Sequence, residues 1–245
     1  MPAALPQPLR NTRVLSLALN LPGPAALMRC ARMGAECTKL EPPPAPGYPS
    51  ADPMGIYSPA AYATLHDGVR VVHAHLKTPE GQAALHDELA RTDVLITSFR
   101  PSALTKLGLG WDALQAQYPR LSLVRIVGAA AERAEEPGHD LTSLADAGLV
   151  TGTEMPPTLY ADMGGALMAS EAVLQALLER AHTGSGVCIE VALADAAAWL
   201  AQPRHWGLTT PDGDVGGNHA GYRIYPCADG RVAVAALEPH FAASL

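Results

Sequence analysis

Apolar residues along most of the chain fall into two recurring patterns. Short apolar runs bounded by turn residues predict buried strands, whereas longer segments with apolar residues at helical spacing predict helices. The expected strands are 13–19, 36–40, 70–76, 93–99, 121–127 and 187–193. The expected helices are one that begins at Pro24 and ends at Gly34, then 79–91, 111–118, a short helix from Asp140, 163–184, and one from Ala194.

The order of these elements predicts the fold class. Strand, tight turn, helix and strand follow one another between residues 13 and 40, which is the order of a right-handed βαβ unit. The alternation continues, so we predict an α/β fold with an open, doubly wound, Rossmann-like parallel sheet. Farther along, YRIYPC and RVAVAAL flank ADG and predict an antiparallel hairpin. We therefore expect a large domain over 1–204 and the start of a smaller β-rich domain over 205–245.

Charge and composition narrow the function classes. The formal net charge is −7, which argues against a nucleic-acid partner on electrostatic grounds. No apolar run is long enough to span a membrane, so we expect a cytoplasmic protein with no membrane partner. The four cysteines show no CxxC pairing or metal-ligand spacing, which indicates free thiols and no metal site.

Three polar residues lie where an α/β fold places chemistry. Asp162 immediately precedes the 163–184 helix, where it could cap the helix or act on a substrate, since a helix N-terminus stabilises negative charge. His139 precedes another helix, and an imidazole can be neutral or protonated near neutral pH; a lone histidine there is otherwise a surface or capping residue. Arg100 follows the end of the 93–99 strand, where ligands of open α/β sheets bind.

Several segments, in matching order, carry a family resemblance. They are LPGPAALMRCARMGAECTKLEPP, the stretch from LKTPEG to YPRL, PGHDLTSLADAGLV, the stretch from YADMGG to ALADA, and YRIYPCADGRVAVAALEPHF. Together they resemble the family III CoA-transferase (CaiB/BaiF) superfamily, and most closely its α-methylacyl-CoA racemase branch. The resemblance implies an enzyme that processes acyl-CoA thioesters.

The resemblance also implies catalytic roles. Asp162 matches the aspartate that transferases use as an acyl-accepting nucleophile and that racemases use as one of two proton carriers. His139 matches the histidine of the racemase branch, and Glu238 matches a glutamate that pairs with that histidine. The combination favours racemase-like or epimerase-like exchange of the α-proton of a 2-substituted acyl-CoA. A CoA-transferase with Asp162 as nucleophile is the first alternative.

Further residues and partners follow from the same resemblance. Arg100, Lys39 and Arg70 match basic positions that contact coenzyme A, although each alone is more often a surface cation. The family's subunits interlock as dimers, so we expect a homodimer. The chain ends soon after EPHF, short of the usual family length, so a separate chain could supply the missing C-terminal half.

One loop departs from the family pattern. Where the family has a GxGQxGP segment, this chain reads GAAAERAEEPGHD, which is acidic and lacks the Gln-Gly-Pro. In the family this loop lines the thioester pocket, so the positioning of the acyl group is expected to differ. The altered loop and the short C-terminus favour a second alternative, a non-catalytic subunit that binds CoA or a partner protein.

Overall fold

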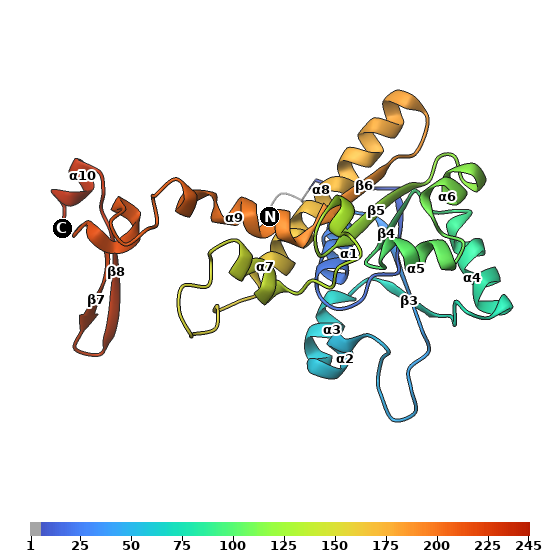
Figure 1. Cartoon of the computed structure of the whole chain (residues 1–245), viewed down its shortest axis with the longest axis horizontal. Helices are drawn as coiled ribbons and strands as arrows, with labels where there is room; N and C mark the ends of the chain where they lie inside the picture. Colours follow the sequence, from blue (N-terminus) through green and yellow to red (C-terminus); the bar gives the residue numbers. More distant parts are fainter. Residues whose placement is uncertain (1–5) are drawn as a thin grey trace. The chain divides into compact units, whose positions relative to one another are not determined.

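The computed structural model describes residues 6–245, and its elements alternate between strand and helix over most of the chain (Figure 1). The chain divides into two compact units, residues 1–197 and residues 198–245. Each unit has its own pattern of secondary structure, so the two are described separately.

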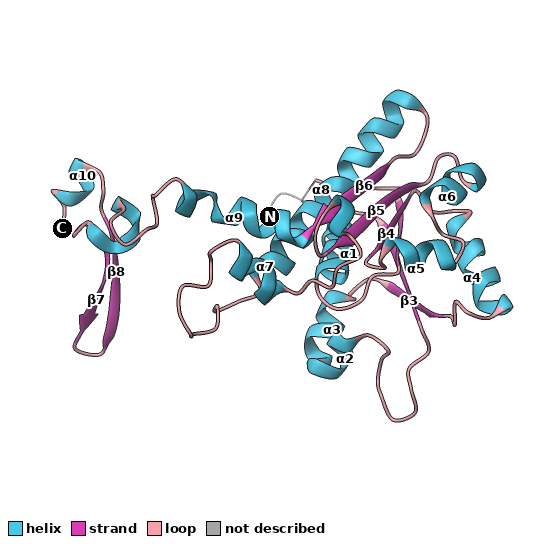
Figure 2. Cartoon of the chain, in the orientation of Figure 1, coloured by secondary structure: helices cyan, strands magenta, loops and turns pink. Residues whose placement is uncertain are grey.

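The first unit is built on a six-stranded sheet in which every neighbouring pair is parallel (Figure 2). The strands are β1 (Arg13–Ser16), β2 (Glu36–Glu41), β3 (Arg70–His73), β4 (Val94–Thr97), β5 (Ser122–Val127) and β6 (Cys188–Ala192). Their order is β3-β2-β1-β4-β5-β6, which is the order of a doubly wound dinucleotide-binding sheet. The predicted fold class is confirmed.

Helices cover both faces of this sheet. On one face, α1 and α8 pack against each other and against alternate strand residues such as Val14 and Val124. On the other face, leucines of α4, α5 and α6 pack against the intervening residues, including Leu15 and Leu123. The helices of this unit are α1 (Pro22–Arg32), α2 (Pro53–Tyr57), α3 (Pro59–Leu65), α4 (Pro79–Leu89), α5 (Pro101–Lys106), α6 (Trp111–Gln117), α7 (Asp140–Asp146) and α8 (Tyr160–Thr183). Both sheet faces are therefore buried, which explains why the strands read as nearly continuous apolar runs.

Two predicted boundaries differ in a way that matters for function. The strand expected over 70–76 ends at His73. The long helix begins at Tyr160 with Leu159 as its N-cap, so Asp162 lies in the first turn and the alternative in which it caps the helix is wrong. A carboxylate in the first turn still interacts favourably with the helix dipole.

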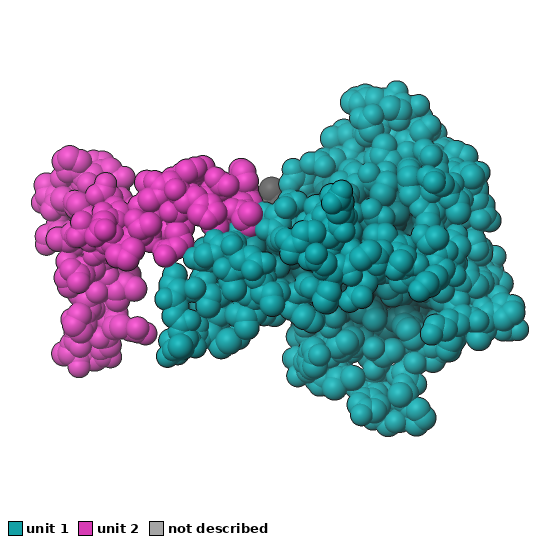
Figure 3. Space-filling view, viewed as in Figure 1, with its two compact units in different colours: residues 1–197 teal, residues 198–245 magenta. Residues whose placement is uncertain are grey.

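The second unit contains the predicted hairpin. Helix α9 (Leu193–His205) crosses the unit boundary, and a short helical segment follows over Asp214–Asn218. Strands β7 (Tyr222–Cys227) and β8 (Gly230–Ala235) then pair antiparallel, and α10 (Pro239–Ala242) follows them. Figure 3 colours the two units separately. Within residues 6–245, no helix combines the length and apolar character needed to cross a lipid bilayer.

A tight backbone contact in the first unit gives a test of the fold. Gly186, two residues before β6, lies so close to the residue before β5 that a Cβ atom on it would overlap the carbonyl oxygen of Leu121. We expect Gly186→Ala to lower the free energy of unfolding by about 1–3 kcal/mol, because the two strands must separate to admit the methyl group. Urea unfolding measures the change.

The matched control is Gly152→Ala, because a Cβ atom there meets no other atom within 4 Å. That substitution should change the unfolding free energy by about 0.5 kcal/mol or less. Equal effects of the two substitutions would contradict the close approach of β6 to the chain before β5.

Candidate active site

A cavity of about 610 Å³ opens at the carboxyl ends of the strands in the first unit. Its walls come from the loops after β1, β4 and β5, from α2, and from the starts of α7 and α8. The lining side chains that carry chemistry or shape the walls are Asn20, Met54, Tyr57, Arg100, Glu136, His139, Asp140, Leu141, Leu159 and Asp162. The sheet order reverses between β1 and β4, and loops that diverge at such a point leave a crevice where ligands bind.

Asp162 is held at the cavity by the first turn of α8. Its backbone N–H donates to the Oδ1 atom of Asp140 at 3.0 Å, which satisfies one of the amides that a helix N-terminus leaves without a partner. Burial, and next the nearby Asp140 carboxylate, raise the pKa of Asp162 to about 6, while His139 acts in the opposite direction. A carboxyl group with this pKa can take up and release a proton near neutral pH.

His139, the residue immediately before α7, also lines this cavity. Its backbone N–H donates to the Thr142 hydroxyl at 3.2 Å, and that hydroxyl donates to the His139 carbonyl at 2.8 Å. These bonds fix the backbone at the helix start. The His139 side chain is exposed where it lines the cavity, so a substrate can reach its imidazole. The structure thus brings Asp162 and His139 to one cavity, and their catalytic roles stay predictions.

The loop before His139 closes through a contact between two glycines. A Cβ atom on Gly138 would lie 2.6 Å from the Cα atom of Gly128, and one on Gly128 would lie 2.8 Å from the Cα atom of Gly138. The two ends of the loop therefore touch, and only glycine fits at both positions. This contact returns the chain from the end of β5 to the edge of the cavity.

Carboxylates hold the rest of this divergent loop. Glu190 of β6 accepts the Ala131 N–H at 2.9 Å while its other oxygen pairs with Arg125 at 2.6 Å. Glu135 accepts both the backbone N–H and the hydroxyl of Ser102, at 2.7 and 2.8 Å, and these bonds lower the pKa of Glu135. These anchors were not predicted from the sequence, in which the acidic composition of the loop is their only signal.

Arg100 also lines the cavity, at the residue before α5. Its side chain is exposed and forms no ion pair with any described residue, although Glu135 lies near enough to sense its charge. The predicted position at a strand end is therefore confirmed, and its contact with CoA stays a prediction.

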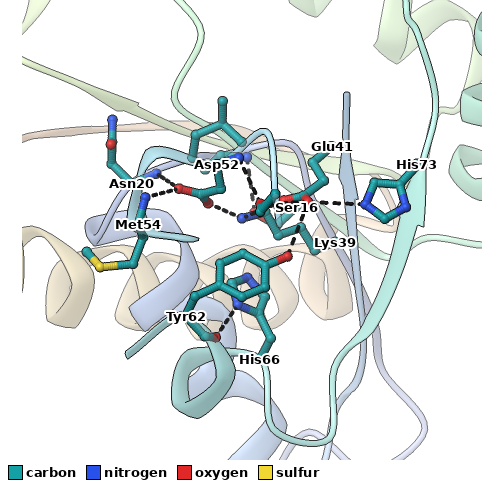
Figure 4. A network of polar contacts seen from close by, with 12 residues as sticks. Ser16, Asn20, Lys39, Glu41, Asp52, Met54, Tyr62, His66 and His73 are labelled. Carbon is teal, nitrogen blue, oxygen red and sulfur yellow. Dashed lines mark hydrogen bonds and ion pairs between the residues drawn. The ribbon is translucent and has the colours of Figure 1, made fainter. Parts of the chain in front are cut away.

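The other two predicted cations lie elsewhere. Lys39 has no exposed surface and pairs with Asp52 and Glu41 in the interior (Figure 4). Arg70 begins β3 at the opposite edge of the sheet, beside a second cavity of about 350 Å³, and pairs with Glu88 at 2.6 Å. Neither side chain lines the cavity that holds Asp162, so the geometry gives no support to their predicted contact with CoA.

Glu238 belongs to the second unit. It is exposed and is the residue before α10. The pairing of Glu238 with His139 stays a prediction. Across residues 6–245, no group of three metal-ligating side chains is arranged to hold an ion.

A sequence model of CoA-transferase family III matches residues 9–245, which is nearly the whole chain. The chain belongs to this family. The predicted resemblance is therefore confirmed.

Relatives within the family differ in their named activities. The chain is 30% identical to succinyl-CoA–D-citramalate CoA-transferase of Chloroflexus aurantiacus, over 92% of this chain and 60% of that protein. It is also 30% identical to human α-methylacyl-CoA racemase, over 95% of this chain and 62% of that protein. A crystal structure of a CaiB/BaiF family protein from Brucella suis matches with a TM-score of 0.80 at 27% identity, over 94% of this chain and 66% of that one. The chain thus spans about 60% of the length of these curated relatives.

The raised pKa of Asp162 makes a prediction about stability. A carboxyl group whose folded-state pKa is raised binds its proton more tightly in the folded than in the unfolded protein, so stability falls as pH rises through the interval from 3.8 to about 6. Asp162→Asn removes this loss of stability with rising pH, because the amide does not titrate. We expect its unfolding free energy, relative to wild type, to increase by about 1 kcal/mol between about pH 4 and about pH 7, a value reduced to allow for solvent screening.

Thermal and urea unfolding across this pH interval provide the measurement. Asp146→Asn, which removes an exposed carboxylate of α7, is the control for the loss of one negative charge. If the difference between Asp162→Asn and wild type does not depend on pH, the Asp162 carboxyl is not perturbed in the folded protein.

Proposed function

We propose that the cavity binds an acyl-CoA thioester and that Asp162 and His139 exchange the proton on its α-carbon. The observation that supports this reaction most directly is that a carboxyl group with a pKa of about 6 and an imidazole line one cavity. Racemisation requires each group to act both as acid and as base. Asp162, with its pKa of about 6, can take either role near neutral pH without a large energetic penalty.

The reaction itself needs little else. A thioester carbonyl acidifies the adjacent C–H bond, so one group removes this proton to leave an enolate and the other returns a proton to the opposite face. The N-terminus of α8, where Asp162 lies, is a region of positive potential that favours negative charge developing near the carbonyl oxygen. Each positioned proton transfer contributes a rate factor of about 10²–10⁴.

Acyl transfer is the second candidate, and the names of relatives favour it. Besides the Chloroflexus enzyme, a relative from Clostridium sporogenes is named cinnamoyl-CoA:phenyllactate CoA-transferase and is 28% identical. In this reaction the Asp162 carboxylate attacks the thioester carbonyl, expels the CoA thiolate and carries the acyl group as a mixed anhydride. His139 has no necessary part in that step.

The assembly is also a proposal. We propose that the chain forms a homodimer or associates with a separate chain. One relative from Chloroflexus aurantiacus, 32% identical over 202 residues, is named as the β subunit of a CoA-transferase. A cytoplasmic location stays a prediction.

Arg100 tests whether the cavity binds CoA. It is the exposed cation at the carboxyl end of β4, and we expect it to bind a phosphate of the cofactor. Arg100→Ala should weaken CoA binding by about 1–3 kcal/mol, the range for losing a hydrogen bond to a charged group. Titration calorimetry measures the dissociation constant.

Lys77→Ala is the matched control, because Lys77 is an exposed cation that does not line the cavity. It should leave the dissociation constant unchanged within about twofold. If Arg100→Ala does the same, Arg100 takes no part in the site.

The two candidate reactions differ in their dependence on His139. For proton exchange, Asp162→Asn and His139→Ala should each abolish racemisation, while one variant still exchanges the α-proton of a single enantiomer because the groups serve opposite faces. For acyl transfer, Asp162→Asn should abolish activity and His139→Ala should leave most of it. Deuterium incorporation into a panel of 2-substituted acyl-CoAs, followed by mass spectrometry, measures the first reaction.

Hydroxylamine trapping of an acyl-enzyme measures the second reaction. The absence of α-proton exchange from the wild-type protein with every acyl-CoA tested would contradict the proposed function. Calorimetric binding of CoA with neither exchange nor trapping would identify a non-catalytic binding subunit.

A further inference from the structure

Three charged side chains are buried in the first unit without any exposed surface. Lys39, Glu41 and Asp52 are each 0% exposed. The Lys39 ammonium pairs with the Oδ2 atom of Asp52 and lies 3.3 Å from the Oε2 atom of Glu41 (Figure 4). Removing ions from water costs several kcal/mol per ion, and an apolar replacement of similar volume is often at least as stable. Stability alone therefore does not account for this cluster.

The second oxygen of Asp52 makes different contacts. Its Oδ1 atom accepts the backbone N–H of Asn20 and that of Met54, each at 2.9 Å. Asn20 lies in the loop between β1 and α1, and Met54 lies in the first turn of α2. Figure 4 shows the carboxylate between these two segments, with Lys39 on its other side. One side chain thus joins two segments that are far apart in sequence.

Both joined segments form walls of the cavity. Asn20 and Met54 are themselves lining residues, and their neighbours Leu21 and Pro53 line it as well. Asn20 has a φ of +66°, in the left-handed region that asparagine adopts more readily than most non-glycine residues. The bond from its N–H to Asp52 fixes the loop in this conformation. The spacing of these walls therefore depends on a carboxylate that does not itself reach the cavity.

We infer that Asp52, neutralised by Lys39, is a positioning residue that sets the spacing between the Asn20 loop and α2 for binding of the CoA thioester. The inference rests on the proposed function of the cavity. It also gives Lys39 a role that differs from the predicted contact with CoA: its charge acts on the site through Asp52.

Glu41 provides a matched control within the same cluster. It is buried to the same extent, but its Oε1 atom bonds the Ser50 hydroxyl at 3.0 Å and the Tyr62 hydroxyl at 3.2 Å, and lies 3.3 Å from the His73 ring. None of these partners lines the cavity. Loss of the Glu41 carboxylate disturbs the same buried network but removes neither of the two bonds from Asp52 Oδ1 to the cavity walls.

The experiment compares three variants by calorimetric titration with CoA and by urea unfolding. Asp52→Ala should weaken CoA binding by about tenfold or more, because two wall amides lose their acceptor. Asp52→Asn should bind within about threefold of wild type, because its amide oxygen can accept the same two N–H groups. Glu41→Ala should lower the unfolding free energy but bind CoA within about threefold of wild type.

Each result decides a separate point. If wild type does not bind CoA, the proposed function fails, and the positioning role fails with it. If wild type binds and Asp52→Ala binds equally well, or if Glu41→Ala weakens binding as much as Asp52→Ala, only the positioning role is overturned. Should Asp52→Ala not fold, hydrogen exchange of the wild-type amides decides. Slow exchange at Asn20 and Met54, together with intact binding by Asp52→Asn, supports the role, and fast exchange at either amide overturns it.

Discussion

The whole first unit depends on burying both faces of one parallel sheet. Residues along each strand alternate between the two helical layers, as Val14 and Leu15 do, so neither face can accommodate a hydrated polar group. Polar side chains can meet water or a ligand only where the strands end. Because the crossovers leave in opposite directions from β1 and β4, the loops at their carboxyl ends diverge and leave a cavity. Arg100, His139 and Asp162 all reach it from such loops or from the helices that follow them.

The low dielectric of this interior affects paired and unpaired charges in opposite ways. Lys39 and Asp52 pair with each other although neither side chain has exposed surface, and the pair connects separate segments of the interior. Asp162 has no ion-pair partner among the described residues, and a second carboxyl group, Asp140, lies nearby. Its pKa therefore rises, and the group becomes able to transfer protons near neutral pH. In our proposals, the buried pair holds two walls of the cavity and the unpaired carboxyl group acts on the substrate.

Much of this architecture could be predicted from the sequence, because it follows from periodicity. The alternation of apolar runs and helical segments predicted the parallel sheet and the hairpin of β7 and β8, and most boundaries are within a few residues. The placement of Arg100 and His139 at the cavity follows from the same rule, since residues after strand ends meet at one edge of the sheet.

The remaining features depend on contacts that no periodicity records. Lys39 was expected to contact CoA because it matches a basic position of the family, and that contact stays a prediction. Asp52 returns beside it after a proline-rich loop and pairs with it in the interior, which no sequence pattern indicated. The start of α8 was misplaced because the side chain that binds its first turn is Asp140, which lies on a different helix. The buried position of Lys39 and the start of α8 both depend on tertiary contacts between polar residues that are distant in sequence.

The most direct test of this account is a crystal structure of the protein with CoA bound. The account predicts that the cofactor thiol lies in the cavity between Asp162 and His139 and that a phosphate group is bonded to Arg100. The Lys39–Asp52 pair should make no contact with the ligand. CoA bound at the opposite edge of the sheet, beside Arg70, or in direct contact with Lys39, would contradict it.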